Sequence, residues 1–175
     1  MFYDGLEDAY DRGKLMGHFA EDCATKYSFT REEQDNFSKT SLKRAMDANN
    51  NGTFDWEIVP VEVKNRKGSI VVSKDEQPFK SNLDKISTLK PAFVKDGTVT
   101  AANSSSISDG ASSVAVASRA FIESKGLNPL AKIIAHTTHS QEPKWFTTAP
   151  VGAISKLLKK TNWTVDEVDL FEVNE

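Results

Sequence analysis

The chain has 175 residues, a formal net charge of −3 and an apolar fraction of 38%, which suits one ordinary domain or pieces of two. It contains no run of about 18 apolar residues that could span a membrane, and its mild negative charge provides no broad basic field for nucleic acid. The single Cys23 is typical of a reducing compartment and the acidic amino-terminal stretch is not a signal or transit peptide, so we predict a cytoplasmic protein.

Two helices are predicted in the first third of the chain. Apolar residues recur at three- and four-residue steps from Leu15 to Tyr27, which is the pattern of one helix face. Thr30 is followed three residues later by Glu33, and this capping-box pattern predicts the start of a second helix. The run of residues 49–52, Asn-Asn-Asn-Gly, tolerates left-handed backbone and predicts its end.

The middle of the chain predicts short strands and loops. Residues 58–63 and 70–72 are β-rich runs on either side of a basic turn, although Pro60 restricts the first run to an edge strand or an irregular segment. Residues 74–90 are charged and lack periodicity, which predicts an extended stretch on the surface. Residues 99–108 are small and polar and predict a loop.

The last third alternates between predicted strands and helices. Residues 111–117 form a short apolar run that suits a buried strand, and residues 118–125 suit a helix capped by a serine. Residues 133–135 predict a strand, residues 149–160 a helix with a proline in its first turn, and residues 168–173 a final strand. This alternation predicts a parallel α/β layer.

Few of the reactive side chains stand in a motif that assigns them a function. Cys23 lies on the apolar helix face, which favours a small buried hydrophobe over a nucleophile. His136 and His139 fall in a strand and loop segment, where their spacing does not favour metal binding. The serines at 104–106 suit either a loop that satisfies its own backbone or one that binds an amide-bearing ligand. Asn174 is either a turn residue or a ligand-binding group at a strand end.

Four blocks of the sequence resemble the thiolase family. LMGHFAEDCATKYSFTREEQDNFSKTS resembles the segment M-G-x-x-A-E-x-x-A and the R-x-E-Q-D helix that follows it in thiolases. PAFVKDGTVTAANSSSISDGASSVAVAS is similar to the signature F-x-x-x-G-T-V-T-A-x-N-[AS]-S-x-x-x-D-G-A. EPKWFTTAPVGAISKLL resembles the segment that opens the second core domain, and DLFEVNE the start of the N-E-A-F box. The blocks occur in the family's order along essentially the whole chain, and the nearest relatives are expected among acetyl-CoA acetyltransferases.

The resemblance implies a partial thiolase-like α/β fold, made of the loop domain and parts of both mixed-sheet core halves. On this expectation, residues 1–124 belong to the amino-terminal half. They include the loop domain at about 1–96 and the last core segment of that half at about 97–124. Residues 130–175 start the carboxyl-terminal half.

The resemblance also implies an acyltransferase that condenses two acetyl-CoA molecules to acetoacetyl-CoA and CoA, or runs the thiolytic reverse. Coenzyme A thioesters are then substrates, and no cofactor or metal is implied. The family's ping-pong mechanism uses a cysteine nucleophile, a histidine and a second cysteine, and no residue of this chain falls on those positions. We therefore expect an internal fragment that is inactive alone, from a parent enzyme that is a homo-oligomer (a dimer or a tetramer). The alternatives are a 3-ketoacyl-CoA thiolase of fatty-acid degradation and a non-catalytic CoA-binding or assembly module.

Five positions match residues with a role in the family. Leu6 and Met16 match apolar residues near CoA, the methionine against its pantetheine arm. Ser105 matches a serine that meets the pantetheine or the reactive region, and Phe146 borders the acyl pocket. Asn174 matches the asparagine that holds a water in one oxyanion hole.

The resemblance has two further consequences, one for the expected CoA site and one for the surface of the chain. Leu15 stands where the family often has a histidine, so one CoA contact is expected to be weaker. The chain is also expected to expose strand edges and apolar faces, because it represents only parts of both core sheets.

Overall fold

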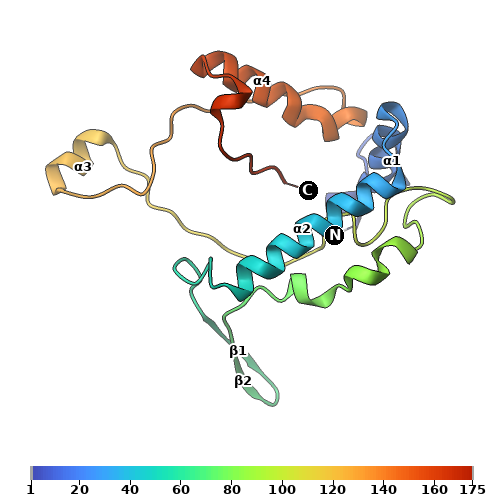
Figure 1. Cartoon of the computed structure of the whole chain (residues 1–175), viewed down its shortest axis with the longest axis horizontal. Coiled ribbons are helices and arrows are strands. Elements are labelled where there is room, and N and C mark those ends of the chain that lie inside the picture. The colour runs from blue at the N-terminus through green and yellow to red at the C-terminus, as the bar shows by residue number, and fades with distance from the viewer. Residues whose placement is uncertain (1, 175) are drawn as a thin grey trace. The chain divides into compact units, whose positions relative to one another are not determined.

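The computed structural model describes residues 2–174, so that Met1 and Glu175, which the predicted domains include, lie outside the described residues (Figure 1). The chain divides into two compact units, Met1–Ser105 and Ser106–Glu175. None of the helices within residues 2–174 has the length and apolar character needed to cross a membrane.

The two helices predicted near the amino terminus are confirmed as α1 (Met16–Tyr27) and α2 (Arg31–Asn50). α1 ends at Ser28, which adopts a left-handed φ of 58° and donates its N–H to the last turn. The predicted capping box starts α2: Thr30 Oγ1 accepts the Glu33 N–H at 3.2 Å, and the Glu33 carboxylate accepts the Thr30 N–H at 2.8 Å. These reciprocal bonds satisfy donors that have no partner inside the helix.

The capping box makes α2 sensitive to acid. Hydrogen bonds from the backbone N–H and then the hydroxyl of Thr30 hold the pKa of Glu33 below its ordinary value of 4.5. A lowered pKa stabilises the folded state above the ordinary value, and that contribution is lost as the pH falls through the folded-state value. We expect Thr30→Ala to raise the pKa of Glu33 towards 4.5, as measured by an NMR titration of the carboxyl carbon. An unchanged midpoint in Thr30→Ala would contradict this assignment.

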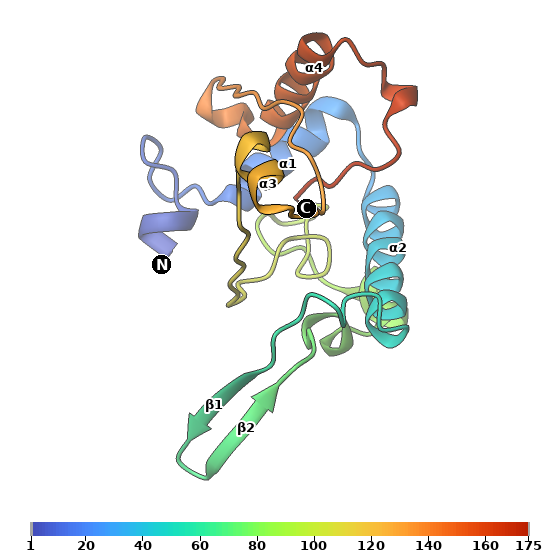
Figure 2. The ribbon, with the colours of Figure 1, turned by 90° about the vertical axis from the view of Figure 1, so that its left-hand side faces the viewer.

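The two β-rich runs form an antiparallel hairpin, β1 (Val61–Asn65) and β2 (Gly68–Val72). Figure 2 shows the strands side by side, projecting from the rest of the first unit. The predicted first strand is too long, because β1 starts only after Pro60, which cannot donate a hydrogen bond to a ladder. Every residue of both strands is exposed, so the hairpin adds nothing to the core.

The prediction that residues 74–90 form an extended stretch is wrong. They contain two short 3-10 helices, η2 (Gln77–Lys80) and η3 (Leu83–Thr88), which pack against α2. Arg31 of α2 donates to the carbonyl oxygens of Ile86 at 3.2 Å and Leu89 at 2.8 Å. Ile86 is only 2% exposed. The conformation of this segment is set by these contacts with a helix distant in sequence. Its own residue pattern, which lacks helical periodicity, therefore did not predict it.

The predicted helices of the second unit are present. α3 (Arg119–Lys125) starts at Ser118, whose Oγ accepts the Phe121 N–H, and ends at Gly126 with a left-handed φ of 62°. The 3-10 helix η4 (Pro143–Thr148) leads into α4 (Ala149–Thr161), which has a proline in its first turn and two lysines in its last. A further short 3-10 helix, η5 (Val165–Glu167), follows.

The three strands predicted at 111–117, 133–135 and 168–173 are not formed within the described residues. The backbone of these segments is irregular and pairs with no neighbouring strand (Figure 1). Apolar composition alone does not make a strand, because its N–H and C=O groups need a partner strand to bond. Within the described residues, the chain therefore has the segments expected to be strands of the mixed sheets and the helices expected beside them. The hydrogen-bonded ladders between those strands are not formed.

The buried core is small and lies in the first unit. Its apolar members are Phe19, Ala24, Ile86 and Val99. The chain exposes 14,494 Å², whereas a folded monomer of 19.3 kDa exposes about 8,500 Å², and two separately folded units of these sizes about 10,000 Å². Many large apolar side chains are exposed, as expected, including Val114 at 85% and Leu170 at 87%.

Candidate functional site

Two of the predicted CoA-contacting residues lie together at the start of α1. Leu6 is half-buried at the end of a short π-helical segment, η1 (Phe2–Leu6). Met16 is the first residue of α1 and is 42% exposed. An isolated antiparallel bridge joins Glu7 to Leu15, which brings the adjacent Leu6 and Met16 to the same end of the paired segments.

The first turn of α1 is capped by its own His18 side chain, which packs against Phe93. His18 Nδ1 accepts the N–H of Leu15 at 3.0 Å, and the His18 ring meets the Phe93 ring edge-on at 5.9 Å between centroids. A Cβ atom on Gly17 would overlap the Phe93 ring. Glycine at this position therefore allows the segment before residue 97 to lie directly on the helix backbone.

A polar loop, residues Thr98–Ser104 (the 98–104 turn), is bound to α1 by one carboxylate. Glu21 is only 8% exposed. Its two oxygens accept the N–H of Thr98, at 2.9 and 3.0 Å, and one of them the N–H of Val99 at 2.8 Å. The Thr98 hydroxyl donates to the same carboxylate at 2.9 Å. The buried charge is therefore stabilised by three donors of the turn.

The same turn is bound to α2 through Asp35, which is 3% exposed. Asp35 accepts from Arg31 Nε at 2.8 Å and from Asn103 Nδ2 at 3.3 Å. Asn103 also closes the turn on itself, because Nδ2 donates to Thr98 O at 3.0 Å and Oδ1 accepts the Thr100 N–H at 2.6 Å. The turn is therefore held by hydrogen bonds to two helices.

The three consecutive serines have different surroundings. Ser104 Oγ donates to the carbonyl oxygen of Thr100, and Ser106 Oγ lies 2.8 Å from Ser108 Oγ. Ser105 is exposed, and its hydroxyl has no hydrogen-bond partner in the part of the chain that the structure describes. The prediction of a loop whose serines bond its own backbone is therefore correct for Ser104. The Ser105 hydroxyl, in contrast, is open to a ligand.

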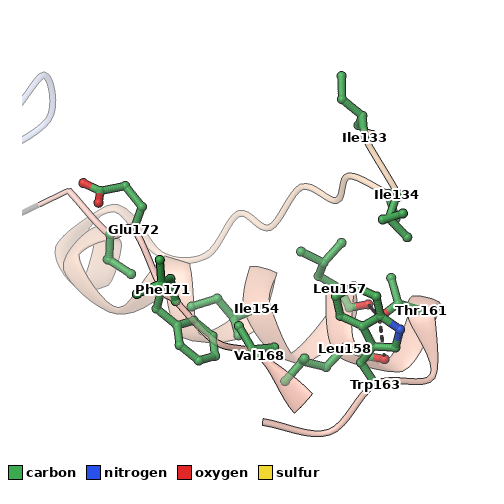
Figure 3. A pocket seen from close by; sticks show the side chains of 13 residues that line it. Ile133, Ile134, Ile154, Leu157, Leu158, Thr161, Trp163, Val168, Phe171 and Glu172 are labelled. Atoms are coloured by element: carbon green, nitrogen blue, oxygen red, sulfur yellow. Dashed lines mark hydrogen bonds between the residues drawn. The ribbon is translucent and has the colours of Figure 1, made fainter. Parts of the chain in front are cut away.

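The other two predicted site residues lie in the second unit. Phe146 is half-buried within η4, and Asn174 is exposed after the segment 168–173. Neither lines the cavity of that unit, which has a volume of about 340 Å³ (Figure 3). The cavity lies between α4 and two extended segments, and its lining is almost entirely apolar: Ile133, Ile134, Ala135, Ile154, Leu157, Leu158, Thr161, Trp163, Val168, Leu170, Phe171, Glu172 and Val173.

The cavity provides little that could do chemistry. Thr161 Oγ1 is engaged with helix carbonyl oxygens, at 3.0 Å from Leu157 O and 3.2 Å from Leu158 O. Glu172 is exposed at its edge. The cavity is best described as the uncovered apolar face of α4, and we place no reactive group in it.

The histidines of the second unit belong to a segment that is fastened to α4. The Thr137 hydroxyl donates to Ala153 O at 2.9 Å, and Lys160 Nζ donates to His136 O at 3.0 Å. The His139 ring lies so close to Gly152 that a Cβ there would meet it at 2.5 Å. Among residues 2–174 no three His, Cys, Asp or Glu side chains gather as metal ligands would.

Sequence reasoning did not assign roles to Glu21, Asp35 or Asn103, the side chains that build the 98–104 turn. Each stands at a fixed letter of a block quoted above: the glutamate of M-G-x-x-A-E, the aspartate of R-x-E-Q-D and the asparagine of G-T-V-T-A-x-N. Those letters were the signal that the sequence offered, because Glu and Asp are almost never fully buried unless they are paired.

Comparison with protein families gives two matches that together cover most of the chain. The profile described as "Thiolase, N-terminal domain" matches residues 1–120, and "Thiolase, C-terminal domain" matches residues 127–175. A probable acetyl-CoA acetyltransferase of Dictyostelium discoideum is 49% identical over 98% of this chain and 42% of its own length. An acetyl-CoA acetyltransferase of Schizosaccharomyces pombe is 45% identical over 98% of this chain and 44% of its own length. The chain thus spans less than half the length of these relatives.

Solved structures agree with the described fold. The acetyl-CoA acetyltransferase of Syntrophomonas wolfei gives a TM-score of 0.88 at 40% identity, covering all of this chain and 44% of its own. The Bacillus anthracis acetyl-CoA acetyltransferase gives 0.90 at 40% identity, over 94% and 42% of the two chains. The Acat5 thiolase of Ascaris suum, solved with coenzyme A, gives 0.87 at 34% identity, over 98% and 44%. The chain has the α/β fold of these proteins over the part that it spans.

Proposed function

The chain belongs to the thiolase family. From this premise we propose that it is part of an acyltransferase that condenses two acetyl-CoA molecules to acetoacetyl-CoA and CoA, or runs the thiolytic reverse. The observation that supports this reaction most is the 49% and 45% identity to acetyl-CoA acetyltransferases along nearly the whole chain. Coenzyme A thioesters are the substrates, and no metal or further cofactor takes part.

Leu6, Met16 and Ser105 contact CoA in this proposal. A pantetheine arm offers apolar methylene groups and amides, so it suits apolar side chains beside a few placed polar groups. The pairing of Glu7 with Leu15, which puts Leu6 beside Met16, supports the apolar contact. The exposed Ser105, next to a turn that is closed by its own hydrogen bonds, supports the polar one.

Phe146 borders the acyl pocket, and Asn174 holds a water that stabilises the oxyanion. A half-buried aromatic ring in η4 supplies apolar surface for a short acyl chain. The side-chain amide of Asn174 can donate one hydrogen bond to a water, which in turn donates to the developing negative charge. The domain boundaries at 124 and 130 remain part of the proposal.

We further propose that the protein is cytoplasmic and a homo-oligomer, a dimer or a tetramer. The free thiol of Cys23 suits a reducing compartment. The exposed apolar side chains of the hairpin, including Val61 and Val71, suit burial against another chain. Cell fractionation and light scattering test these two statements.

The 175 residues by themselves are expected to show no thiolysis of acetoacetyl-CoA with CoA. Covalent catalysis needs an activated thiolate and a proton donor beside it, and the one cysteine, Cys23, is half-buried within α1. Release of acetyl-CoA, followed by chromatography, measures this. Turnover that Cys23→Ala abolishes would contradict the expectation and make Cys23 the nucleophile.

A chimera tests the proposed function itself. The segment of the Syntrophomonas wolfei enzyme that aligns with this chain is replaced by the 175 residues, and the product is assayed for thiolysis. We expect activity with the four-carbon substrate above that with longer 3-ketoacyl-CoA substrates. A preference for the longer substrates would instead favour a 3-ketoacyl-CoA thiolase of fatty-acid degradation. A folded, inactive chimera that still binds CoA would favour the non-catalytic module.

A further inference from the structure

Glu21 connects the two parts of the first unit that hold the proposed CoA contacts. It lies in α1, the helix that starts at Met16, and its carboxylate binds the start of the 98–104 turn. That turn leads directly into Ser105. Both carboxylate oxygens of Glu21 take part in these hydrogen bonds from α1 to the turn.

We propose that Glu21 is a positioning residue: its carboxylate fixes the 98–104 turn against α1 and thereby sets where Ser105 lies relative to Met16. The proposal rests on the proposed function for the statement that these two residues contact CoA. It adds a residue that touches no substrate and acts only through the turn.

A carboxylate suits this position better than any other side chain. It is an acceptor on both oxygens, and three donors point at it, the N–H groups of Thr98 and Val99 and the Thr98 hydroxyl. A glutamine would keep one acceptor oxygen and turn an NH₂ group towards one of these donors. A buried donor without a partner is costly, so the turn would move to satisfy it.

The neighbouring backbone is shaped to admit the carboxylate. A Cβ atom on Gly97 would overlap Glu21 Oε1 and would approach Val94 Cγ2 to 2.7 Å, so glycine leaves the space in which the carboxylate meets the turn. Thr100, the residue that follows the anchored amides of Thr98 and Val99, is fully buried. The Asp35–Asn103 bond holds the far end of the turn on α2, and Glu21 binds its near end to α1.

The test compares Glu21→Gln with Ile86→Val in the full 175-residue chain. Ile86 is buried in the same unit, and its substitution lowers stability without removing a hydrogen bond of the turn. We expect Glu21→Gln to shift the NMR amide signals of Ser104 and Ser105 and to weaken CoA binding, measured by calorimetry, by about tenfold. Ile86→Val should lower the melting temperature and leave both readouts unchanged.

Amide signals of Ser104 and Ser105 at their wild-type positions in Glu21→Gln would overturn the proposal, because the turn would then hold without the carboxylate. So would an equal loss of CoA affinity in Ile86→Val, because general destabilisation would explain both. Should Glu21→Gln fail to fold, Thr98→Val replaces it, since this variant removes only the hydroxyl donor. It should shift the same two signals by a smaller amount, and unshifted signals overturn the proposal equally.

The same measurements separate this proposal from the proposed function. If the wild-type chain gives no heat with CoA, the CoA contacts assigned to Met16 and Ser105 are wrong for these residues. The amide signals of the ligand-free chain still decide whether Glu21 sets the turn. If wild type binds CoA and Glu21→Gln binds equally well, the CoA site stands and the positioning role is wrong.

Discussion

We expect Asn174→Ala, introduced into the active chimera, to lower kcat for thiolysis by about 100- to 1,000-fold, the usual cost of removing one oxyanion-hole donor. The amide acts through a water on charge that develops only in the transition state. The loss should therefore fall on kcat, while KM changes little. Steady-state kinetics with acetoacetyl-CoA and CoA measure both constants.

Asn128→Ala is the matched control for this variant. Asn128 is likewise an exposed asparagine of the second unit in irregular backbone, but the proposed site does not use it. Its kcat should stay within about twofold of the parent chimera, as for a surface substitution away from a site. A value of kcat in Asn174→Ala equal to that of Asn128→Ala would remove Asn174 from the catalytic machinery.

The second large effect is structural: Ile86→Ala should lower the free energy of unfolding of the first unit by about 2–5 kcal/mol. Ile86 is 2% exposed and lies in η3, which packs on α2. Arg31 holds the backbone around it through two carbonyl oxygens, so the surroundings cannot easily collapse into the cavity left by the missing atoms. Urea denaturation followed by circular dichroism measures the change.

Ile133→Ala is the corresponding control in the second unit. Ile133 is 70% exposed, so its truncation removes little buried area and should change stability by less than about 0.5 kcal/mol. The same chemical change thus has different costs because burial differs. Equal losses in the two variants would show that η3 does not pack on α2 as described.

Helix and hairpin boundaries followed from local chemistry that the sequence states directly. The capping box of Thr30 and Glu33, the Ser118 cap and the left-handed Gly126 each act within a few residues of themselves. Their prediction therefore needed no knowledge of the rest of the chain. Pro60 similarly set where β1 begins, although the prediction placed that start too early.

Strand formation was different, because it depends on a partner. The segments 111–117 and 168–173 have the composition of strands, yet within the described residues they have no neighbour to bond. Residues 74–90 were mispredicted for a related reason: their 3-10 turns rest on contacts with α2 that lie far away in the sequence.

The sequence by itself indicated the family blocks and predicted α1, α2, α3, α4 and the five proposed site residues. Only the tertiary structure assigned Glu21, since an acidic residue in a helix is ordinarily expected to face water. Its burial makes sense once folding brings the donors of Thr98, 77 residues further along the chain, against its carboxylate. Local signals report caps and turns because those bonds close within one segment, whereas a buried charge is compensated by groups that only the folded chain brings to it.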